Sequence, residues 1–190
     1  MLPTPEYRLT EKQKESVYDP AEDTFLLMDA LEKEIELLRA LRPAIALEVG
    51  VGSGVVSTFL AKALSFPLLS LGTDRNEDAT DLVSALFDRL RGTVDVLLFN
   101  PPYVPTEEEE GTSDLARCWA GGEKGTSTLG RLLPMVPDLL SPRGLFYVVA
   151  LKQNDVPALL KHSDRLRGSI AVERRAGIEY LYILKFERIS

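Results

Sequence analysis

Short apolar runs alternate with amphipathic stretches along most of the chain. The runs at Ile45–Val49, Leu68–Gly72, Val94–Phe99 and Gly144–Leu151 predict buried strands, because they are continuous and rich in β-branched and aliphatic side chains. Apolar residues at helical spacing predict helices between these strands. The predicted helices are Ala21–Leu41, Val55–Leu64, Asp78–Leu90, Leu129–Leu140 with an irregularity at Pro134 and Pro137, and Val156–His162.

The last part of the chain has a different pattern. Two polar-apolar runs, Ser169–Arg174 and Glu179–Phe186, flank Ala176-Gly177 and predict an antiparallel hairpin. Strands that alternate with helices pair in parallel and are covered on both faces. We therefore predict an α/β three-layer sandwich of Rossmann-like class, with a mostly parallel sheet and a C-terminal antiparallel hairpin. Residues 1–16 are predicted to form an N-terminal tail and residues 17–190 a single domain.

Composition narrows the class of protein. A length of 190 residues with 45% hydrophobic content suits one globular domain with a proper core. One cysteine, Cys118, and one histidine, His162, leave neither a disulfide framework nor a conventional zinc site to expect. No apolar run approaches the length of a membrane span, so a soluble, intracellular protein is expected. The net charge of -7 disfavours autonomous binding to a nucleic acid backbone.

The segment Asn100-Pro101-Pro102-Tyr103 directly follows the predicted strand Val94–Phe99. The two prolines fix φ and donate nothing to a ladder, so the strand ends there. Ligands of open α/β sheets bind beyond the carboxyl ends of strands, where Asn100 would offer a donor and an acceptor. Asn-Pro also starts many turns, so the segment by itself leaves a simple turn open.

A glycine-rich segment from Glu48 to Gly54 lies between a predicted strand and a predicted helix. Its glycines, Gly50, Gly52 and Gly54, permit a tight turn and the close approach of a ligand to the backbone. The spacing differs from the dinucleotide fingerprint, and Glu48 would repel a pyrophosphate but suit a cationic or amino-bearing ligand. The segment therefore favours S-adenosylmethionine over a nicotinamide dinucleotide.

Asp74 stands at the end of the second predicted strand. Its carboxylate is placed to accept hydrogen bonds from both hydroxyls of a ribose, a role common to both cofactor classes. A helix cap or a turn residue is the alternative for an aspartate at this position.

The segment Asn100-Pro101-Pro102-Tyr103 distinguishes an enzyme that uses S-adenosylmethionine from one that uses a nicotinamide dinucleotide, because the two transfer different groups to their substrates. A planar NH2 group is a poor methyl acceptor, because conjugation spreads the nitrogen lone pair into the adjoining π-system. Asn100 Oδ1 and the Pro101 carbonyl oxygen could each accept one N–H and favour a pyramidal nitrogen, while Tyr103 packs on the planar group. A hydride-transferring enzyme has no use for such a pair of acceptors. The segment therefore predicts a clamp for an amide or exocyclic amine nitrogen.

The segment Asn100–Tyr103 and the glycine-rich segment Glu48–Gly54 together resemble motifs of class I S-adenosylmethionine-dependent methyltransferases that act on planar NH2 groups. This group includes adenine-N6 and release-factor glutamine methyltransferases. Three further segments narrow the resemblance to eukaryotic HemK-type release-factor glutamine methyltransferases; they are Val-Tyr-Asp-Pro-Ala-Glu-Asp-Thr at 17–24, Trp-Ala-Gly-Gly at 119–122 and Leu-Leu-Ser-Pro-Arg-Gly-Leu-Phe-Tyr at 139–147. The resemblance implies methylation of the glutamine in the Gly-Gly-Gln loop of the eukaryotic class I translation release factor. It also implies a cytoplasmic location, with the nucleus as a second one.

The resemblance assigns roles to individual residues. It implies cofactor contacts from Thr24, Glu48, Gly50, Gly52, Gly54, Asp74, Asp81 and Leu82. Asn100 is implied to contact both cofactor and substrate, with Pro101, Pro102 and Tyr103 completing the catalytic segment. Trp119 either shapes the substrate groove or is a packing anchor. No metal ligand is implied.

One departure from the family concerns residues 75–80, which alone separate Asp74 from Asp81. The family places a helix and a strand there, so about twenty residues, enough for one such pair, are predicted to be missing. The lost strand would lie at the sheet edge, where the preceding strand becomes the new edge. The family also works with a small zinc-binding activator subunit, and the resemblance implies docking along this edge, which leaves the partner more open than the chemistry.

Other functions stay open at this point. Adenine-N6 methylation of nucleic acid involves the same kind of NH2 group, although the acidic charge disfavours it. Lysine methylation of proteins is a further activity that the sequence leaves open. A catalytically silent scaffold is the alternative from another class, because the shortened segment 75–80 adjoins the predicted cofactor pocket.

Overall fold

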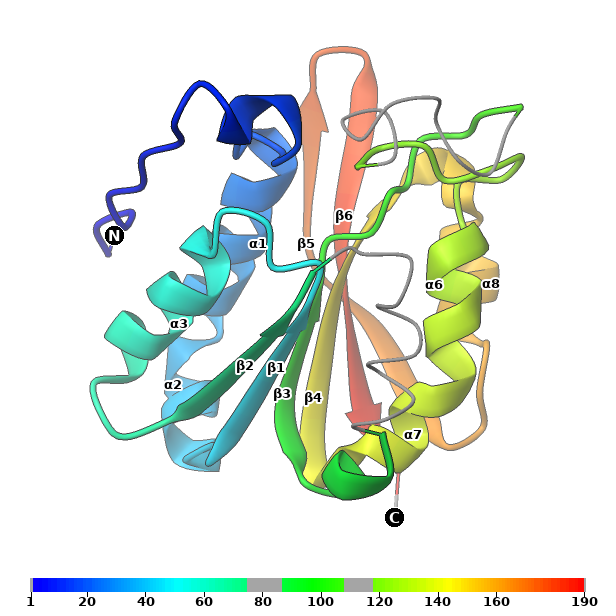
Figure 1. Ribbon diagram of the computed structural model, residues 1–190. Coiled ribbons are helices and arrows are strands. Elements are labelled where there is room, and N and C mark those ends of the chain that lie inside the picture. Colours follow the sequence, from blue (N-terminus) through cyan, green and yellow to red (C-terminus); the bar gives the residue numbers. More distant parts are fainter. Residues whose placement is uncertain (1, 75–86, 108–117, 190) are drawn as a thin grey trace.

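The computed structural model describes residues 2–74, 87–107 and 118–189 as a six-stranded sheet with helices on both faces (Figure 1). The strand order is β2-β1-β3-β4-β6-β5. The strands are β1 Ile45–Val49, β2 Leu69–Thr73, β3 Val94–Phe99, β4 Leu140–Leu151, β5 Leu166–Ala176 and β6 Glu179–Arg188. The helices are η1 Gln13–Glu15, α1 Glu22–Lys33, α2 Ile35–Leu41, α3 Val55–Leu64, α6 Ser127–Leu132, η2 Leu133–Met135, α7 Val136–Leu139, η3 Lys152–Asn154 and α8 Val156–Leu160.

The pairing of the strands confirms the predicted fold class. β2, β1, β3 and β4 are mutually parallel, whereas β6 runs antiparallel to both β4 and β5. Helices α1, α2 and α3 cover one face of the sheet, and α6, α7 and α8 cover the other (Figure 1). The chain is thus a three-layer α/β sandwich with a C-terminal hairpin.

The central strand β3 shows why its sequence is apolar at every position except Asp95. Val96 and Leu98 belong to the core beneath α1 and α3, whereas Leu97 and Phe99 belong to the core beneath α6 and α7. All four side chains are buried. A parallel strand covered on both faces has no solvent side, so its one polar side chain, Asp95, lies near the start of the strand and is hydrogen-bonded.

The sheet order places a topological switch point between β1 and β3. The chain leaves β1 for α3 on one face and later passes from β3 to α6 on the other face (Figure 1). The parallel registers pair Val49 with both Thr73 and Phe99, so the residues that follow, Gly50, Asp74 and Asn100, end neighbouring strands at one edge. Ligands of open α/β sheets bind in the crevice at such a point.

The predicted hairpin is present and longer than expected. Residues 181–187 of β6 pair with residues 151–145 of β4, so the hairpin is joined to the sheet along most of β6. β5 pairs with β6 in turn from Leu166 to Ala176. Gly177 has φ +61° in the turn, a conformation that favours glycine. The tip of the hairpin rises beyond the carboxyl ends of the parallel strands (Figure 1).

The prediction of one helix over Ala21–Leu41 is wrong in its continuity. α1 ends at Lys33 and α2 begins at Ile35, with Glu34 between them at φ -99° and ψ 16°. No glycine or proline marks this position, and the apolar spacing is helical on both sides. The break coincides with hydrogen bonds of the Glu34 side chain to the sheet, and these contacts cannot be read from the local sequence.

The strand predicted at Gly144–Leu151 begins earlier than expected, because β4 already starts at Leu140. The register with β3 shifts between Val94 and Val96, so the intervening residues of β4 form an irregularity within the strand. The Ser141 hydroxyl donates to Asp95 Oδ1 at 2.7 Å, which ties this irregularity to β3.

Two predictions concern residues beyond the described ones or the membrane. Most of the predicted helix Asp78–Leu90 lies outside the described residues. Its described part, residues 87–90, is helical. Within the described part of the chain, no helix combines the length and apolar character that crossing a membrane requires.

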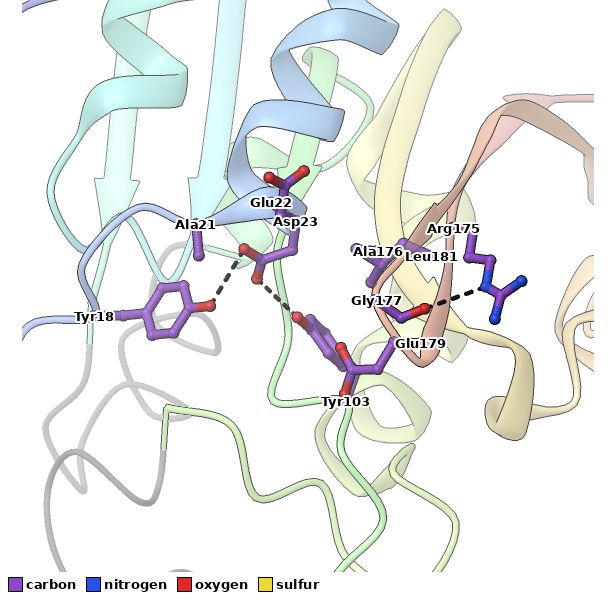
Figure 2. Close-up of a pocket in the computed structure, with 10 residues that line it drawn as sticks. All are labelled: Tyr18, Ala21, Glu22, Asp23, Tyr103, Arg175, Ala176, Gly177, Glu179 and Leu181. Carbon is purple, nitrogen blue, oxygen red and sulfur yellow. Dashed lines mark hydrogen bonds between the residues drawn. The ribbon is translucent and has the colours of Figure 1, made fainter.

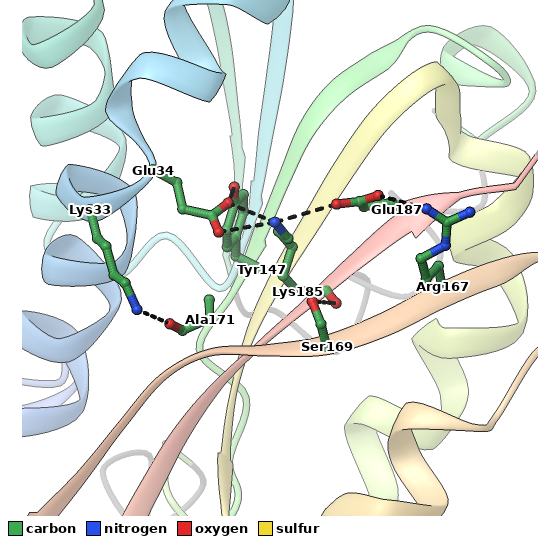
Figure 3. A network of polar contacts seen from close by, with 8 residues as sticks. All are labelled: Lys33, Glu34, Tyr147, Arg167, Ser169, Ala171, Lys185 and Glu187. Atoms are coloured by element: carbon green, nitrogen blue, oxygen red, sulfur yellow. Dashed lines mark hydrogen bonds and ion pairs between the residues drawn. The ribbon is translucent and has the colours of Figure 1, made fainter.

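A polar network joins the break between α1 and α2 to the sheet (Figure 3). The Glu34 carboxylate accepts from the Tyr147 hydroxyl at 2.7 Å and from Lys185 Nζ at 2.9 and 3.0 Å. Burial raises the pKa of the Tyr147 phenol, and the Glu34 contact raises it further. Burial lowers the pKa of Lys185, but its contacts with Glu34 and Glu187 outweigh this and the net shift is upward. The network therefore holds the ion pair of Glu34 and Lys185 at the C-terminal end of α1.

Tyr147→Phe should lower the free energy of unfolding by about 1–2 kcal/mol, because it removes one donor from a largely buried carboxylate. Tyr180→Phe is the control, since no hydrogen bond of the Tyr180 hydroxyl is found among the described residues. Urea denaturation of both variants measures the effect. Equal stability of the two variants would contradict a stabilising role for the Glu34 network.

Candidate active site

The glycine segment after β1 forms the tight turn that the sequence predicted. Gly50, Gly52 and Gly54 have φ values of +68°, +48° and +73°, which disfavour any side chain. Val51 N donates to the Thr73 carbonyl at 2.9 Å, so the turn is joined to the end of β2. A Cβ on Gly52 or Gly54 would meet nothing within 4 Å, so the backbone there borders open space.

Two carboxylates flank this turn. Asp74 Oδ2 accepts from Gly52 N, and Glu48 Oε2 accepts from the backbone N at 3.0 Å and the hydroxyl of Ser57. Burial raises the pKa of Glu48 to about 7; the Ser57 hydrogen bonds lower it and the Asp74 charge raises it. A pKa of about 7 places the titration of Glu48 close to neutral pH. A cationic neighbour would favour its ionised form.

A buried carboxylate that the sequence analysis did not single out lies at the centre of the site. Asp23, in the first turn of α1, is only 3% exposed. Its Oδ2 accepts from Asn100 Nδ2 at 2.9 Å and from the Tyr103 hydroxyl at 3.0 Å, and its Oδ1 accepts from the Tyr18 hydroxyl at 3.3 Å. Figure 2 shows the two tyrosines converging on this carboxylate. Asp23 thus joins the N-terminal segment, α1 and the loop after β3.

The Asp23 carboxylate is itself held by the backbone. Thr24 N donates to Asp23 Oδ1 at 2.8 Å, and the Thr24 hydroxyl lies 3.4 Å from the same oxygen. Burial raises the pKa of both Tyr18 and Tyr103, and the Asp23 charge raises each further. The two phenols therefore stay protonated and remain donors at physiological pH.

These contacts decide how the Asn100 amide is turned. An ionised carboxylate only accepts hydrogen bonds, so the NH2 end of Asn100 must face Asp23. The opposite atom, Asn100 Oδ1, is buried and has no hydrogen-bond partner among the described residues. A buried acceptor without a partner is costly, which indicates that a ligand donor satisfies it.

The loop after β3 is supported from behind by a second loop. Val104 N donates to the Trp119 carbonyl at 2.9 Å and Gly121 N donates to the Val104 carbonyl at 2.8 Å. Asn154 Nδ2, which is buried, donates to the Tyr103 carbonyl at 2.9 Å. A Cβ on Gly125 would lie 2.1 Å from that same carbonyl oxygen, so the second loop can approach this closely only because position 125 is glycine.

A pocket of about 450 Å³ opens beside Asp23 and Tyr103 (Figure 2). The start of α1 forms one wall and the tip of the β5–β6 hairpin forms the other. Its lining residues are Tyr18, Ala21, Glu22, Asp23, Tyr103, Arg175, Ala176, Gly177, Glu179 and Leu181. The Arg175 side chain turns away to donate to the Gly177 carbonyl at 3.2 Å, which leaves the pocket wall acidic.

The structure brings together most of the residues that the sequence singled out. Gly50, Asp74 and Asn100 meet at neighbouring strand ends, and Tyr103 joins Asn100 through Asp23. The Trp119 backbone pairs with the loop after β3, and Trp119 is 42% exposed. Other predicted residues are placed as follows: Pro101 is buried, Pro102 is half-buried, Thr24 is buried beside Asp23, and Asp81 and Leu82 lie outside the described residues.

Tyr18, Asp23, Ser57 and Asn154 received no role in the sequence analysis. Tyr18 and Asp23 belong to the segment 17–24 that carries the resemblance, and this was the available signal. Ser57 follows Glu48 by nine residues, so the glycine-rich segment was the available signal for it. Asn154 lies 51 residues from Tyr103, whose carbonyl it contacts, and no local pattern identifies it. Among residues 2–74, 87–107 and 118–189, no group of three or more His, Cys, Asp or Glu side chains is arranged to hold a metal ion.

Comparison with known proteins identifies the family. The human methyltransferase HEMK2 is 45% identical over 194 residues, covering 90% of this chain and 90% of the relative. The chain belongs to the HEMK2 and Mtq2 family of release factor glutamine methyltransferases. The eRF1 methyltransferase catalytic subunit mtq2 of Schizosaccharomyces pombe is 35% identical, and the alignment covers 100% of this chain and 97% of the relative. No protein-family model matches the chain.

A solved structure of the same family agrees in fold. Mtq2 of E. cuniculi, in its complex with Trm112, superposes with a TM-score of 0.68 at 28% identity and covers 92% of this chain and 99% of that one. The alignment with the S. pombe relative extends over 225 positions, although this chain has 190 residues, so the relative contains residues that this chain lacks. In the described sheet β2 is an edge strand, as the predicted deletion requires.

Glu48→Gln should change the pH dependence of stability. The pKa of Glu48 rises from 4.5 to about 7 on folding, so the folded wild type binds more protons between these pH values and loses stability as the pH rises through them. The variant lacks this titration. Its melting temperature, measured without cofactor, should therefore rise relative to wild type across that interval and keep a constant difference above it.

Glu173→Gln, at an exposed position on β5, is the matched control and should follow the wild type at every pH. A pH-independent difference between Glu48→Gln and wild type would show that the Glu48 carboxyl titrates normally in the folded protein.

Proposed function

We propose that this chain transfers a methyl group from S-adenosylmethionine to the side-chain amide nitrogen of a glutamine in a class I translation release factor. The observation that carries the proposal is the buried Asn100 Oδ1, which lacks a partner among the described residues and faces away from Asp23. An acceptor fixed in this way selects a ligand that donates an N–H, as a primary amide does.

The strand ends fit S-adenosylmethionine. The turn at Gly52 and Gly54 leaves open space for a ligand at the backbone, and the carboxylates of Glu48 and Asp74 favour a cation. Asp74 would hold the ribose hydroxyls, and Glu48 would face the positively charged part of the cofactor. When bound, S-adenosylmethionine supplies an electrophilic methyl group on a sulfonium centre.

The residues of the catalytic loop would prepare the acceptor nitrogen. Asn100 Oδ1 accepts one amide N–H and the Pro101 carbonyl oxygen accepts the other, which weakens the conjugation that makes an amide nitrogen a poor nucleophile. The Tyr103 ring covers the planar group, and its hydroxyl is held by Asp23 at 3.0 Å. Fixing the amide in this geometry lowers the entropic cost of reaching the transition state.

The names of the relatives support the substrate. The S. pombe relative is described as the eRF1 methyltransferase catalytic subunit, and the E. cuniculi complex as responsible for methylation of the eRF1 termination factor. Adenine offers a similar conjugated NH2 group, but the net charge of -7 disfavours a nucleic acid substrate.

Asn100→Ala should lower kcat for methylation of a release factor by about 100-fold or more, by analogy with the loss of one oriented polar group from an enzyme site. The variant should stay folded but melt below wild type, by about 2–4 °C for each kcal/mol lost, because it removes one donor from the buried Asp23 carboxylate. A methyl-transfer assay compares intact release factor, the same protein with the Gly-Gly-Gln glutamine changed to alanine, and duplex DNA.

Methylation undiminished by the glutamine change would reject the proposed acceptor, and transfer to duplex DNA would favour the adenine alternative. Calorimetry with S-adenosylmethionine covers the silent scaffold: absence of binding would reject the enzymatic function. Wild-type kcat in Asn100→Ala would reject the clamp.

We further propose that a small subunit of the Trm112 kind binds along β2. The support is that β2 pairs only with β1 in the described sheet and that Leu69 is 55% exposed on it. An edge strand with an exposed apolar side chain is a common site for pairing with another chain. The partner in the E. cuniculi complex gives the class of subunit to test.

Leu69→Arg should reduce binding of such a subunit at least about 10-fold, because a charge would replace apolar contact at the edge. Leu37→Arg is the control, since Leu37 is a leucine of similar exposure, 44%, that belongs to helix α2 and not to the edge strand. Co-purification followed by calorimetry measures both. Equal binding by the two variants would place the partner elsewhere.

A further inference from the structure

We infer that Asp23 is a positioning residue that decides which atom of the Asn100 amide meets the acceptor nitrogen. The inference deepens the proposed function and rests on it. Asp23 belongs to α1, 77 residues away from Asn100, and the 2.9 Å hydrogen bond between them joins two separate elements at the strand ends. It would not need to touch substrate or cofactor to control the reaction.

The donors around Asp23 leave the Asn100 amide a single arrangement. Asp23 Oδ2 faces Asn100 Nδ2 and the Tyr103 hydroxyl, both of which donate to it. If the Asn100 amide turned over, its oxygen would lie against the carboxylate oxygen, and two acceptors would repel each other. Asp23 is the described residue to which Asn100 Nδ2 donates, so this one contact distinguishes the two ends of the amide.

The carboxylate of Asp23 cannot easily turn to relieve such a clash. Thr24 N donates to Oδ1 at 2.8 Å, and this donor is part of the first turn of α1 and cannot reverse its direction. Asp23 is 3% exposed, so water does not offer a replacement donor. The backbone of α1 therefore fixes the carboxylate, and the carboxylate fixes the amide.

Asp23→Asn keeps the shape of the side chain, removes its negative charge and replaces one acceptor atom with a donor. Thr24 N will draw the oxygen of the new amide toward itself, so the new NH2 group faces Asn100. The Tyr103 hydroxyl can rotate to accept, but Asn100 must turn over and offer its oxygen to position 23. Its NH2 end then faces the substrate, where a donor meets a donor and the acceptor amide is no longer bound correctly.

A swap of the two residues restores the original pattern. In Asn100→Asp alone, two carboxylates face each other and the site lacks the donor that oriented them. In Asp23→Asn combined with Asn100→Asp, the NH2 group of position 23 donates to one oxygen of position 100. The other oxygen of position 100 then faces the substrate as an acceptor, as Asn100 Oδ1 does in wild type.

Steady-state kinetics on a glutamine-containing release factor tests this in four variants. Asp23→Asn and Asn100→Asp should each lower kcat about 100-fold with a small effect on KM for cofactor. The double variant should exceed the better single variant by about 10-fold, whereas independent losses would multiply. Asp29→Asn, the same change on α1 at a residue paired with Arg174, is the control and should retain wild-type kcat.

Proton exchange of the Asn100 side-chain amide gives a second readout that does not need turnover. The signal is assigned by its loss in Asn100→Asp. One of its protons should exchange slowly in wild type and in Asp29→Asn, where it is bonded to Asp23, and both should exchange fast in Asp23→Asn. Thermal unfolding checks that every variant is folded.

The two readouts separate the possible failures. If wild type methylates glutamine but the double variant is no better than the single variants, or the exchange is unchanged in Asp23→Asn, the positioning role is wrong. If wild type transfers no methyl group to glutamine while the exchange pattern is as expected, the proposed function fails and the orientation of Asn100 by Asp23 stands.

Discussion

The buried carboxylate of Asp23 is the constraint on which the arrangement of the site depends. A charge that is 3% exposed is stable only when hydrogen bonds replace the lost water. Here two donors are local, a backbone N–H of α1 and the Tyr18 phenol, and two, the Asn100 amide and the Tyr103 phenol, lie 77 and 80 residues away in the chain. Moving Tyr18, Asn100 or Tyr103 away would remove a donor from this buried charge. One carboxylate therefore holds helix α1, the N-terminal segment and the loop after β3 together.

Helix α1 is fixed equally well at its other end. Lys33 Nζ donates to the Ala171 carbonyl at 2.8 Å, and Lys185 Nζ donates to the Glu34 carboxylate at 2.9 Å (Figure 3). These contacts tie α1 to the hairpin strands, whose tip forms the far wall of the pocket beside Tyr103. α1 thus lies between the loop after β3, which it contacts through Asp23, and the hairpin strands, which it contacts near its C-terminal end.

The distribution of charge gives the site its chemical character. Asp23, Glu48 and Asp74 place three carboxylates around the strand ends, each with a defined internal donor. Such a set favours a positively charged cofactor and disfavours a phosphate-bearing one. The acceptor end is defined by a neutral amide oxygen, which selects an N–H donor. A cationic methyl donor and a primary amide acceptor satisfy both requirements, as the family of the chain suggests.

The sequence by itself determined the strand β3, the glycine turn, the parallel sheet with its terminal hairpin, and the place of Asn100 at a strand end. These follow from local rules: continuous apolar runs, glycines at positive φ and prolines that end a ladder. Only the tertiary structure decided which way the Asn100 amide is turned, that Asp23 turns it, and that α1 breaks at Glu34. Each of these depends on hydrogen bonds between residues far apart in the chain, and a linear pattern carries no record of which donor meets which acceptor.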